Sequence, residues 1–445
     1  MVFSIFLTNF QVVNLLVHMR YLYSLLLVVI FAGCKSSLPY TNVQIDVNYG
    51  DGYGPCEPSI AIDPNNPNRM VAGAVLDRAY YSEDGGQTWS KQQISSSFGV
   101  WGDPVVIADF KGNFYYFHLS FPSGIGGWEG DKLDRMVCQK STDGGKTWSD
   151  GSYTGLFHPK DQDKEWAVVD PANNNIYMTW TQFDAYGSDN PEDRSNILFS
   201  KSEDEGASWS PAIQINQFSG DCIDDDQTTE GAVPAVGPDG SIYVAWALND
   251  TLYFDRSTDQ GETWLQEDLI VSDQPQGWDQ KIPGVGRANG LPITLCDLSQ
   301  GPNRGRIYVN WSDQRSGEND TDIWLAYSDD QGLTWSSPKR VNDDRGKAHQ
   351  FFPWATIDQS TGHLYIVYYD RRKTSGTTTN VYLAISKDGG QTFQNQRINE
   401  KSFEGNTQVF FGDYNNIVAV DGKVRPIWTQ VDGLDLSIWT ALIDF

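Results

Sequence analysis

Three short motifs place an arginine beside an aspartate. They are Asp77-Arg78, Asp313-Gln314-Arg315 and Asp370-Arg371-Arg372, and each follows an apolar run typical of a β-strand. An arginine guanidinium presents a flat fork of N–H donors that matches a carboxylate or a sulfate. The motifs therefore predict an anion-binding surface. The alternative is that each arginine pairs with its own aspartate and only orders a loop.

Residues able to move protons lie in other irregular segments. Histidine, carboxyl and phenol groups serve as general acids, bases or nucleophiles when they lie within reach of a substrate. A histidine in a loop, however, is usually only solvated. The candidate catalytic residues are Asp103, Tyr414, His158 and His349, and Lys164 is a further candidate for binding an anion.

One acidic segment, Asp221-Cys222-Ile223-Asp224-Asp225-Asp226, offers the hard oxygen ligands that calcium prefers. It lacks the fixed ligand spacing of an EF-hand loop, so a solvated acidic loop is the simpler interpretation. Aromatic residues at Phe351-Phe352 and Phe410-Phe411 supply surfaces of the kind on which sugars stack. We expect neither a cofactor nor a catalytic metal.

The scaffold for these residues is indicated by six copies of the pattern Ser-x-Asp-x-Gly-x-Thr/Ser-Trp/Phe. The Asp and Ser/Thr side chains can hydrogen-bond nearby backbone groups and hold a tight turn, and the glycine supplies a positive φ. Catalytic aspartates do not come in six equivalent copies, so we expect a structural role. The aspartates are Asp84, Asp143, Asp204, Asp259, Asp330 and Asp388.

A second repeat gives the number of units. An aspartate closes a short apolar strand seven times, and a tight turn and a second strand such as Ser241–Trp246 follow it. Seven repeats, each long enough for four short strands, predict an all-β, seven-bladed β-propeller with strands A to D in each blade. A six-bladed propeller is the alternative. The strand-closing residues are Asp63, Asp109, Asp170, Asp239, Asp297, Asp358 and Asp421.

The last unit, from Asn416 to Phe445, lacks a fourth strand, whereas Asn42–Val47 resembles the fourth strands of other units. We expect this N-terminal strand to complete the last blade, because closing the ring removes exposed sheet edges. In such a ring the D–A and B–C loops share one face. The candidate site residues all lie in these loops, which predicts one functional face.

The N-terminal residues are typical of a targeting segment. Tyr21–Ala32 is apolar and follows Arg20, which predicts a signal peptide over residues 1–33, and we expect translation to start at Met19. Phe31-Ala32-Gly33-Cys34 resembles a bacterial lipobox, which implies lipidation of Cys34. Residues 34–41 would form a tether and residues 42–445 one propeller domain in the bacterial cell envelope, periplasmic or at the outer-membrane surface. A transmembrane anchor is the alternative.

The composition of the chain limits the kinds of ligand and partner that the protein can bind. The formal net charge is −26, which excludes nucleic acid as a ligand and restricts acidic glycans to places where positive residues gather. We expect a monomer. The remaining cysteines show no metal-binding spacing and predict one or two disulfides, or buried thiols. They are Cys56, Cys138, Cys222 and Cys296.

The six-copy pattern resembles the Asp box, and an exported Asp-box propeller resembles the sialidase superfamily over the whole predicted domain. The resemblance implies that Arg78, Arg315 and Arg371 clamp a substrate carboxylate, that Asp103 is the acid/base and that Tyr414 is the nucleophile. The family's Arg-Ile-Pro motif is absent from the sequence. Sialidases also have six blades, and both departures weigh against sialidase activity itself.

Two other functions fit the same face. A polysaccharide lyase could use His158, His349 and Tyr414 to abstract a proton next to a uronate. Alternatively, the propeller could bind a glycan, a glycoprotein or another protein without catalysis. An enzyme predicts a polar pocket with unpaired arginines at the channel mouth, whereas a binding module predicts arginines paired with their neighbouring aspartates.

Overall fold

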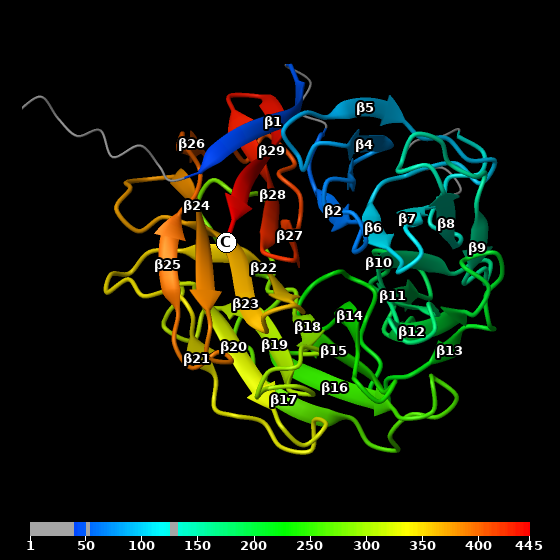
Figure 1. Ribbon diagram of the computed structural model, residues 1–445. Coiled ribbons are helices and arrows are strands. Elements are labelled where there is room, and N and C mark those ends of the chain that lie inside the picture. Colours follow the sequence, from blue (N-terminus) through cyan, green and yellow to red (C-terminus); the bar gives the residue numbers. More distant parts are fainter. Residues whose placement is uncertain (1–39, 50–53, 125–131) are drawn as a thin grey trace, which may run out of the picture. The chain divides into compact units, whose positions relative to one another are not determined.

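A computed structural model describes residues 40–49, 54–124 and 132–445 of the chain. Residues 40–445 form one compact unit in which seven antiparallel sheets surround a central axis (Figure 1). The predicted seven-bladed β-propeller is therefore confirmed. The predicted signal peptide and Cys34 lie outside the described residues. No helix in the described part of the chain is long and apolar enough to cross a membrane.

Each blade has four strands, with the first strand nearest the axis and the fourth at the periphery. Blade 1 contains β2 (Ser59–Ile62), β3 (Met70–Ala74), β4 (Arg78–Ser82) and β5 (Ser90–Gln93). Blade 2 contains β6 (Val105–Ala108), β7 (Phe114–Leu119), β8 (Met136–Ser141) and β9 (Ser152–Thr154). Blade 3 contains β10 (Asp161–Val169), β11 (Ile176–Phe183), β12 (Ser195–Ser202) and β13 (Ile213–Gln214). Blade 4 contains β14 (Glu230–Val236), β15 (Ile242–Leu248), β16 (Thr251–Ser257) and β17 (Leu269–Asp273).

The remaining blades follow the same order. Blade 5 contains β18 (Ile293–Cys296), β19 (Ile307–Asp313), β20 (Asp322–Ser328) and β21 (Lys339–Arg340). Blade 6 contains β22 (Gln350–Asp358), β23 (His363–Asp370), β24 (Thr378–Ser386) and β25 (Gln394–Arg397), and β26 (Phe403–Glu404) also pairs with β24. Blade 7 contains β27 (Asn416–Val420), β28 (Lys423–Asp432), β29 (Asp435–Asp444) and β1 (Thr41–Asn48).

The second strand of each blade forms its core. In β11, β15 and β19 every residue is buried, because both faces of these strands pack against neighbouring blades. Large aromatic side chains fill the wedge between blades, where their area contributes most to burial. Four tryptophans at matching positions of the second strands are fully buried: Trp180, Trp246, Trp311 and Trp428.

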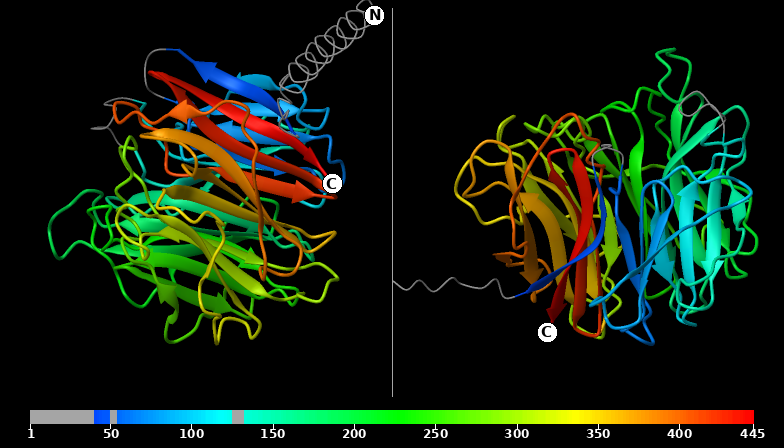
Figure 2. Two further views of the ribbon diagram at one scale, coloured as in Figure 1. Left: turned by 90° about the vertical axis from the view of Figure 1, so that its left-hand side faces the viewer. Right: turned by 90° about the horizontal axis from the view of Figure 1, so that it is seen from above.

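The N-terminal strand closes the ring, as predicted. Strand β1 pairs with β29 from Thr41 opposite Leu442 to Asn48 opposite Leu436 (Figure 2). Asp46 of β1 also reaches blade 1, where it accepts hydrogen bonds from the Tyr80 hydroxyl at 2.6 Å and the Lys91 ammonium at 2.7 Å. One strand therefore joins the last blade to the first.

The Asp boxes are turns that stabilise themselves. In the first box Asp84 Oδ1 accepts hydrogen bonds from Ser82 Oγ at 2.8 Å and from the Thr88 backbone N–H at 2.9 Å, and Oδ2 accepts one from Thr88 Oγ1 at 2.6 Å. Gly86 has a φ of 91°. The same bonds recur in the other five boxes, which fits the structural role expected for these aspartates.

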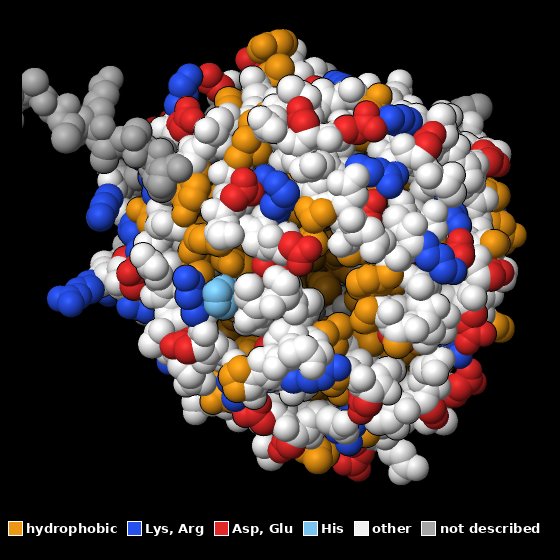
Figure 3. All heavy atoms as spheres, viewed as in Figure 1, with side chains coloured by type: hydrophobic (Ala, Val, Ile, Leu, Met, Phe, Trp, Pro, Cys, Tyr) orange, Lys and Arg blue, Asp and Glu red, His pale blue; other side chains and the backbone are white. Residues whose placement is uncertain are grey.

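The Asp boxes share a face with the A–B turns, since Lys111 in the turn of blade 2 pairs with Glu205 in the box of blade 3. The C-terminus lies on this face, and Figure 3 shows it with a central hollow floored by hydrophobic side chains. The long D–A and B–C loops cover the opposite face. All four cysteines in the described part of the chain are buried and free, so the buried-thiol alternative holds.

Candidate active site

Charged residues reach the axis because the first strands begin with an unusual backbone conformation. Glu57, Asp103, Lys164 and Phe352 each stand six residues before a strand-closing aspartate and have φ values of 52°, 48°, 56° and 49°. Such left-handed residues are rare outside glycine and mark bulges that redirect side chains. In β10 the register shifts between Asp163 and Trp166. The result is a ring of polar side chains at the loop-rich end of the channel.

Two cations and three carboxylates form a continuous network there. Lys164 Nζ lies 3.0 Å from Asp103 Oδ2 and 3.1 Å from Asp413 Oδ2. Arg287 forms a second bridge, with Nε donating to Asp413 Oδ1 at 2.8 Å and Nη1 to Asp224 Oδ2 at 2.9 Å. We call these five residues the central cluster. It joins loops and strands from blades 2, 3, 4, 5 and 7.

Further carboxyl groups lie near the central cluster, and burial raises the pKa of each of them. Burial, and then the Asp103 and Asp413 carboxylates, raises the pKa of Glu57 well above its usual value. Burial raises the pKa of Asp163 to about 8 despite the adjacent Lys164 charge. Glu165 and Glu230 are also buried, their carboxyl oxygens have no hydrogen-bond partner in the described structure, and burial raises the pKa of both.

The pKa of Asp413 is shifted in the opposite direction. Although its burial opposes ionisation, the charges of Arg287 and Lys164 hold the pKa of Asp413 well below its usual range. Its backbone N–H also donates to Glu57 Oε1 at 3.1 Å. Protonated and ionised carboxyl groups therefore lie around the same lysine, an arrangement that separates an acid from a base.

Aromatic side chains from different blades pack against one another next to the central cluster. The rings of Trp166 and Trp354, from blades 3 and 6, lie 4.1 Å apart between centroids, and Tyr414 packs on Trp166 at 5.1 Å. The Tyr414 hydroxyl is buried without a hydrogen-bond partner among the described residues. Burial, and then the nearby Asp103 charge, raises the pKa of Tyr414, so its phenol stays neutral.

The central cluster opens to solvent at Arg287. The Arg287 side chain is 37% exposed, whereas that of Lys164 is 5% exposed. Its guanidinium lies 5.5 Å from the centroid of the exposed Phe410 ring. Asp224 is fixed by the Tyr186 hydroxyl at 2.6 Å and the Trp278 indole N–H at 3.2 Å. A ligand arriving at the channel mouth thus meets an arginine and an aromatic face.

The structure brings together three of the predicted site residues, namely Asp103, Lys164 and Tyr414. The predicted arginines lie outside the central cluster, and two of them pair with the aspartate of their own motif. Arg315 pairs with Asp313 at 2.6 Å, and Arg372 pairs with Asp370 at 2.7 Å. These two arginines follow the loop-ordering alternative.

The other two arginines also lie outside the central cluster. Arg78 lies 3.5 Å from Asp46 of β1. Arg371 is buried and donates to the Pro283 carbonyl at 2.7 Å, while its Nη2 has no partner among the described residues. No ion pair in the described part of the chain joins any of these arginines to the central cluster.

The histidines are separate from the central cluster. His158 is exposed in the loop before β10. His349 is buried, its Nδ1 lies 2.9 Å from Thr321 Oγ1, and burial followed by the Arg371 charge lowers its pKa to about 4. His349 is therefore neutral at pH 7.

Sequence reasoning missed Arg287 and the roles of Asp163, Asp224 and Asp413. The charged residues six positions before the strand-closing aspartates of blades 1, 2 and 3 are Glu57, Asp103 and Lys164, so this spacing marks the site but none of the four missed residues. Asp224, in the segment considered for calcium, instead binds Arg287 and Tyr186. Among the described residues no group of three or more His, Cys, Asp or Glu side chains is arranged to hold a metal ion.

Comparison with known proteins agrees with this architecture. The BNR/Asp-box repeat model matches residues 80–91 and 326–337. A sialidase from Bacteroides fragilis (strain YCH46) is 32% identical over 315 residues, which cover 64% of this chain and 52% of that protein. An oligoxyloglucan-reducing end-specific xyloglucanase from Emericella nidulans is 38% identical over 76 residues, 15% of this chain and 9% of that protein. The chain thus spans about half the length of the sialidase, and far less of the xyloglucanase.

A solved polysaccharide lyase of family PL25, an ulvan lyase, superposes with a TM-score of 0.54 at 13% identity and covers 91% of this chain and 96% of the lyase. Similarity at that identity concerns the fold alone. Together with the Asp-box hydrogen bonds and the closed ring of blades, these comparisons identify the chain as a seven-bladed β-propeller with BNR/Asp-box repeats that is similar to a sialidase over 64% of its length.

Proposed function

We propose that the protein acts on acidic glycans as a sialidase-like glycoside hydrolase, with the central cluster and Asp163 as its reaction centre. The observation that carries this proposal is the contact of Lys164 with Asp103 at 3.0 Å and with Asp413 at 3.1 Å, next to the buried Asp163. Burial raises the pKa of Asp163, whereas the charges of Arg287 and Lys164 lower that of Asp413. Glycoside hydrolases generally need one protonated and one ionised carboxyl group beside the scissile bond. The 32% identity to a sialidase supports a saccharide substrate.

The residues of the proposed reaction centre have distinct roles. Asp163, whose pKa is raised to about 8 by burial, donates a proton to the leaving-group oxygen. Asp103 is the least buried carboxylate next to Lys164 and faces the sugar. Arg287 binds the carboxylate of the substrate, and Phe410 stacks against a ring. Asp413, the ionised carboxyl group beside Arg287 and Lys164, accepts the proton of the water that replaces the leaving group at the sugar carbon. Lys164 holds the carboxylates in place.

The test is a substrate panel with three readouts. The purified protein is incubated with sialosides and acidic polysaccharides, and released sialic acid, new reducing ends and unsaturated uronate are measured. We expect hydrolysis that falls at least about 100-fold in Asp163→Asn, the usual size of general-acid catalysis. Asp255→Asn is the matched control, because Asp255 is a buried carboxyl in β16 whose pKa burial raises to about 7, outside the central cluster. Equal losses in both variants would contradict the role of Asp163.

A second candidate is glycan binding without catalysis. The pairing of Arg315 with Asp313 and of Arg372 with Asp370 favours it, because neither guanidinium is free to clamp a substrate. This candidate predicts that a glycan binds at Arg287 and Phe410 with no product in any of the three assays. Unsaturated uronate as the product would instead indicate lyase chemistry.

We also propose that the protein is exported and lipidated at Cys34, as the sequence around Phe31–Cys34 suggests. A thioether-linked lipid on Cys34 would anchor the propeller to a membrane of the cell envelope. Metabolic labelling with a fatty-acid analogue, followed by membrane fractionation, tests this. Label that persists in Cys34→Ser would exclude lipidation at this residue.

A further inference from the structure

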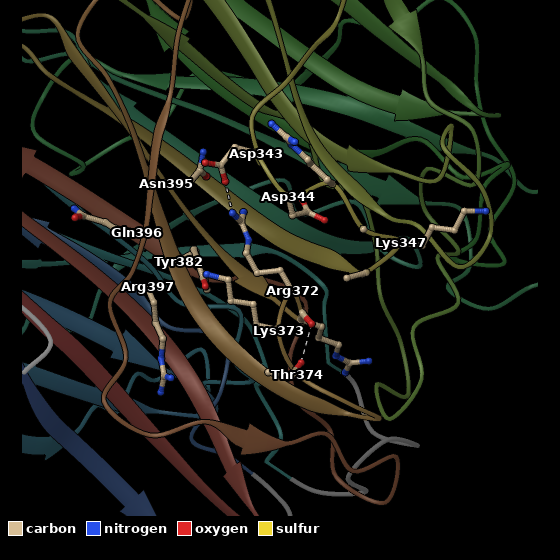
Figure 4. Close-up of a pocket in the computed structure, with 14 residues that line it drawn as sticks. Asp343, Asp344, Lys347, Arg372, Lys373, Thr374, Tyr382, Asn395, Gln396 and Arg397 are labelled. Atoms are coloured by element: carbon tan, nitrogen blue, oxygen red, sulfur yellow. Dashed lines mark hydrogen bonds and ion pairs between the residues drawn. The ribbon is translucent and has the colours of Figure 1, made fainter. Parts of the chain in front are cut away.

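A polar cavity lies away from the central cluster, at the periphery between blades 5 and 6. It is an open groove of about 740 Å³ along β25, the outermost strand of blade 6 (Figures 1 and 4). Its lining comes from four elements: the loop at residues 343–348, the loop at residues 371–374, β24 through Tyr382, and β25. We call it the peripheral groove. Its volume is in the range of sites that bind small ligands.

Cations dominate the lining of the peripheral groove. Arg345, Lys347, Lys373 and Arg397 all line it, and none of them forms an ion pair within the described part of the chain. Figure 4 shows Arg397 and Lys347 on opposite sides of the groove, with Lys373 between them. The positive charges are thus spread along the groove rather than gathered at one point.

Two carboxylates line the peripheral groove, and one of them is paired with a cation. Asp343 pairs with Arg372, which also binds Asp370 at 2.7 Å and lies 4.5 Å from the Tyr382 ring centroid. Asp344 Oδ1 accepts a hydrogen bond from Asn342 Nδ2 at 2.6 Å, whereas its buried Oδ2 has no hydrogen-bond partner among the described residues. Arg397 donates to the carbonyls of Asn399 and Glu400 through Nε and Nη2, which leaves Nη1 for a ligand. Arg345, Lys347 and Lys373 form no ion pair in the described part of the chain and are available as well. In a chain of net charge −26 such a surplus of positive charge is a local exception.

We propose that the peripheral groove binds an anionic polysaccharide chain, with carboxylate or sulfate groups on successive sugars meeting Lys373, Arg397 and Arg345. Separate cations on three elements match a polymer that repeats its charge, whereas a single small anion would use only one of them. The lining contains few apolar side chains, chiefly Tyr382 and Ala348. This composition disfavours a lipid surface or the buried apolar anchors of a peptide ligand.

The proposal does not depend on catalysis at the central cluster, because the peripheral groove would hold a chain whether or not it is cleaved. Binding is measured by isothermal titration calorimetry at low salt with polygalacturonate, dextran sulfate, neutral dextran and polyglutamate. We expect binding of polygalacturonate or dextran sulfate, weaker in 0.5 M NaCl because salt screens exposed charges. The preferred polymer shows whether carboxylate or sulfate is recognised.

The decisive variant is Lys373→Glu/Arg397→Glu, for which we expect affinity at least about tenfold lower, equivalent to 1.4 kcal/mol. The matched control is Lys387→Glu/Lys423→Glu, which makes the same change of charge on the Asp-box face of blades 6 and 7. Binding should also persist in Asp163→Asn, which separates this site from the reaction centre.

Three results would overturn the proposal. The first is the absence of binding to both anionic polysaccharides. The second is an equal loss of affinity in the two charge-reversal variants, which would indicate a general charge effect. The third is polyglutamate binding as tightly as either polysaccharide, which would show that the peripheral groove recognises an acidic peptide chain.

Discussion

The ammonium of Lys164 lies 3.1 Å from Asp413 Oδ2, although the two residues belong to the third and seventh blades of the ring. Both side chains are almost wholly buried, at 5% and 1% exposure. Charges removed from water are stable only when each has its partner, so this contact ties blades across the axis as well as shaping the candidate active site.

The first prediction concerns this pair. Lys164→Met leaves Asp103 and Asp413 buried with one cation fewer, and breaking a buried pair on one side costs about 3 kcal/mol. We expect the free energy of unfolding, measured in urea, to fall by that amount. Adding Asp103→Asn should restore part of the loss, because one uncompensated carboxylate is removed. A single variant as stable as the parent would show that the contact contributes nothing.

The fold could be predicted from the sequence because its determinants are local and repeated. Each Asp box brings its own hydrogen bonds within eight residues, as between Asp84 and Thr88, so every copy forms the same turn. The closing strand was also predictable, since Asn42–Val47 completes a repeat that the last blade lacks.

The centre of the site could not be predicted in the same way. Arg287 meets Asp413 only because two long loops from blades 5 and 7 converge over the channel. Local pairing, in contrast, follows from the sequence, because an arginine two residues after an aspartate can pair with it directly, as Arg315 does with Asp313. Sequence spacing reveals contacts within a blade, whereas contacts across the axis depend on the closed ring.

The second prediction concerns an Asp box. Asp330→Ala removes an acceptor of hydrogen bonds from Ser328 Oγ at 2.7 Å, Thr334 N at 2.9 Å and Thr334 Oγ1 at 2.6 Å. Because the turn is exposed, we expect a loss of only about 1 to 2 kcal/mol in unfolding free energy. Glycan turnover or binding should be unchanged. A loss of function without a loss of stability would argue against a structural role.

The third prediction concerns ring closure. Asp46→Ala deprives the Tyr80 hydroxyl and the Lys91 ammonium of their shared acceptor and loosens β1 from blade 1. We expect a loss of about 2 kcal/mol, because a buried hydroxyl is left unsatisfied. Hydrogen exchange should increase first in β1 and β29, the strands that close the ring. Unchanged exchange there would mean that pairing with β29 alone holds β1.

The fourth prediction is the dependence of stability on pH. Asp163 has a folded-state pKa raised to about 8 by burial, well above the unfolded value of about 3.9. An acidic group whose pKa is higher in the folded protein than in the unfolded chain stabilises the fold. This contribution is complete below the pKa of the unfolded chain and is lost as the pH rises through the pKa of the folded protein. The folded state therefore holds an extra proton on Asp163 between about pH 4 and pH 8. Burial also raises the pKa values of Glu57, Glu165 and Glu230, so these groups act in the same direction.

We therefore expect the unfolding free energy to fall as pH rises from 4 to 8, by up to about 1.4 kcal/mol per pH unit for each such group. Asp163→Asn removes one of these groups without adding charge, so its stability should depend less steeply on pH over this window. Urea titrations at four pH values measure both slopes. Parallel slopes for the variant and the parent would show that Asp163 is ionised in the folded protein, and they would also remove the acid on which the proposed hydrolysis depends.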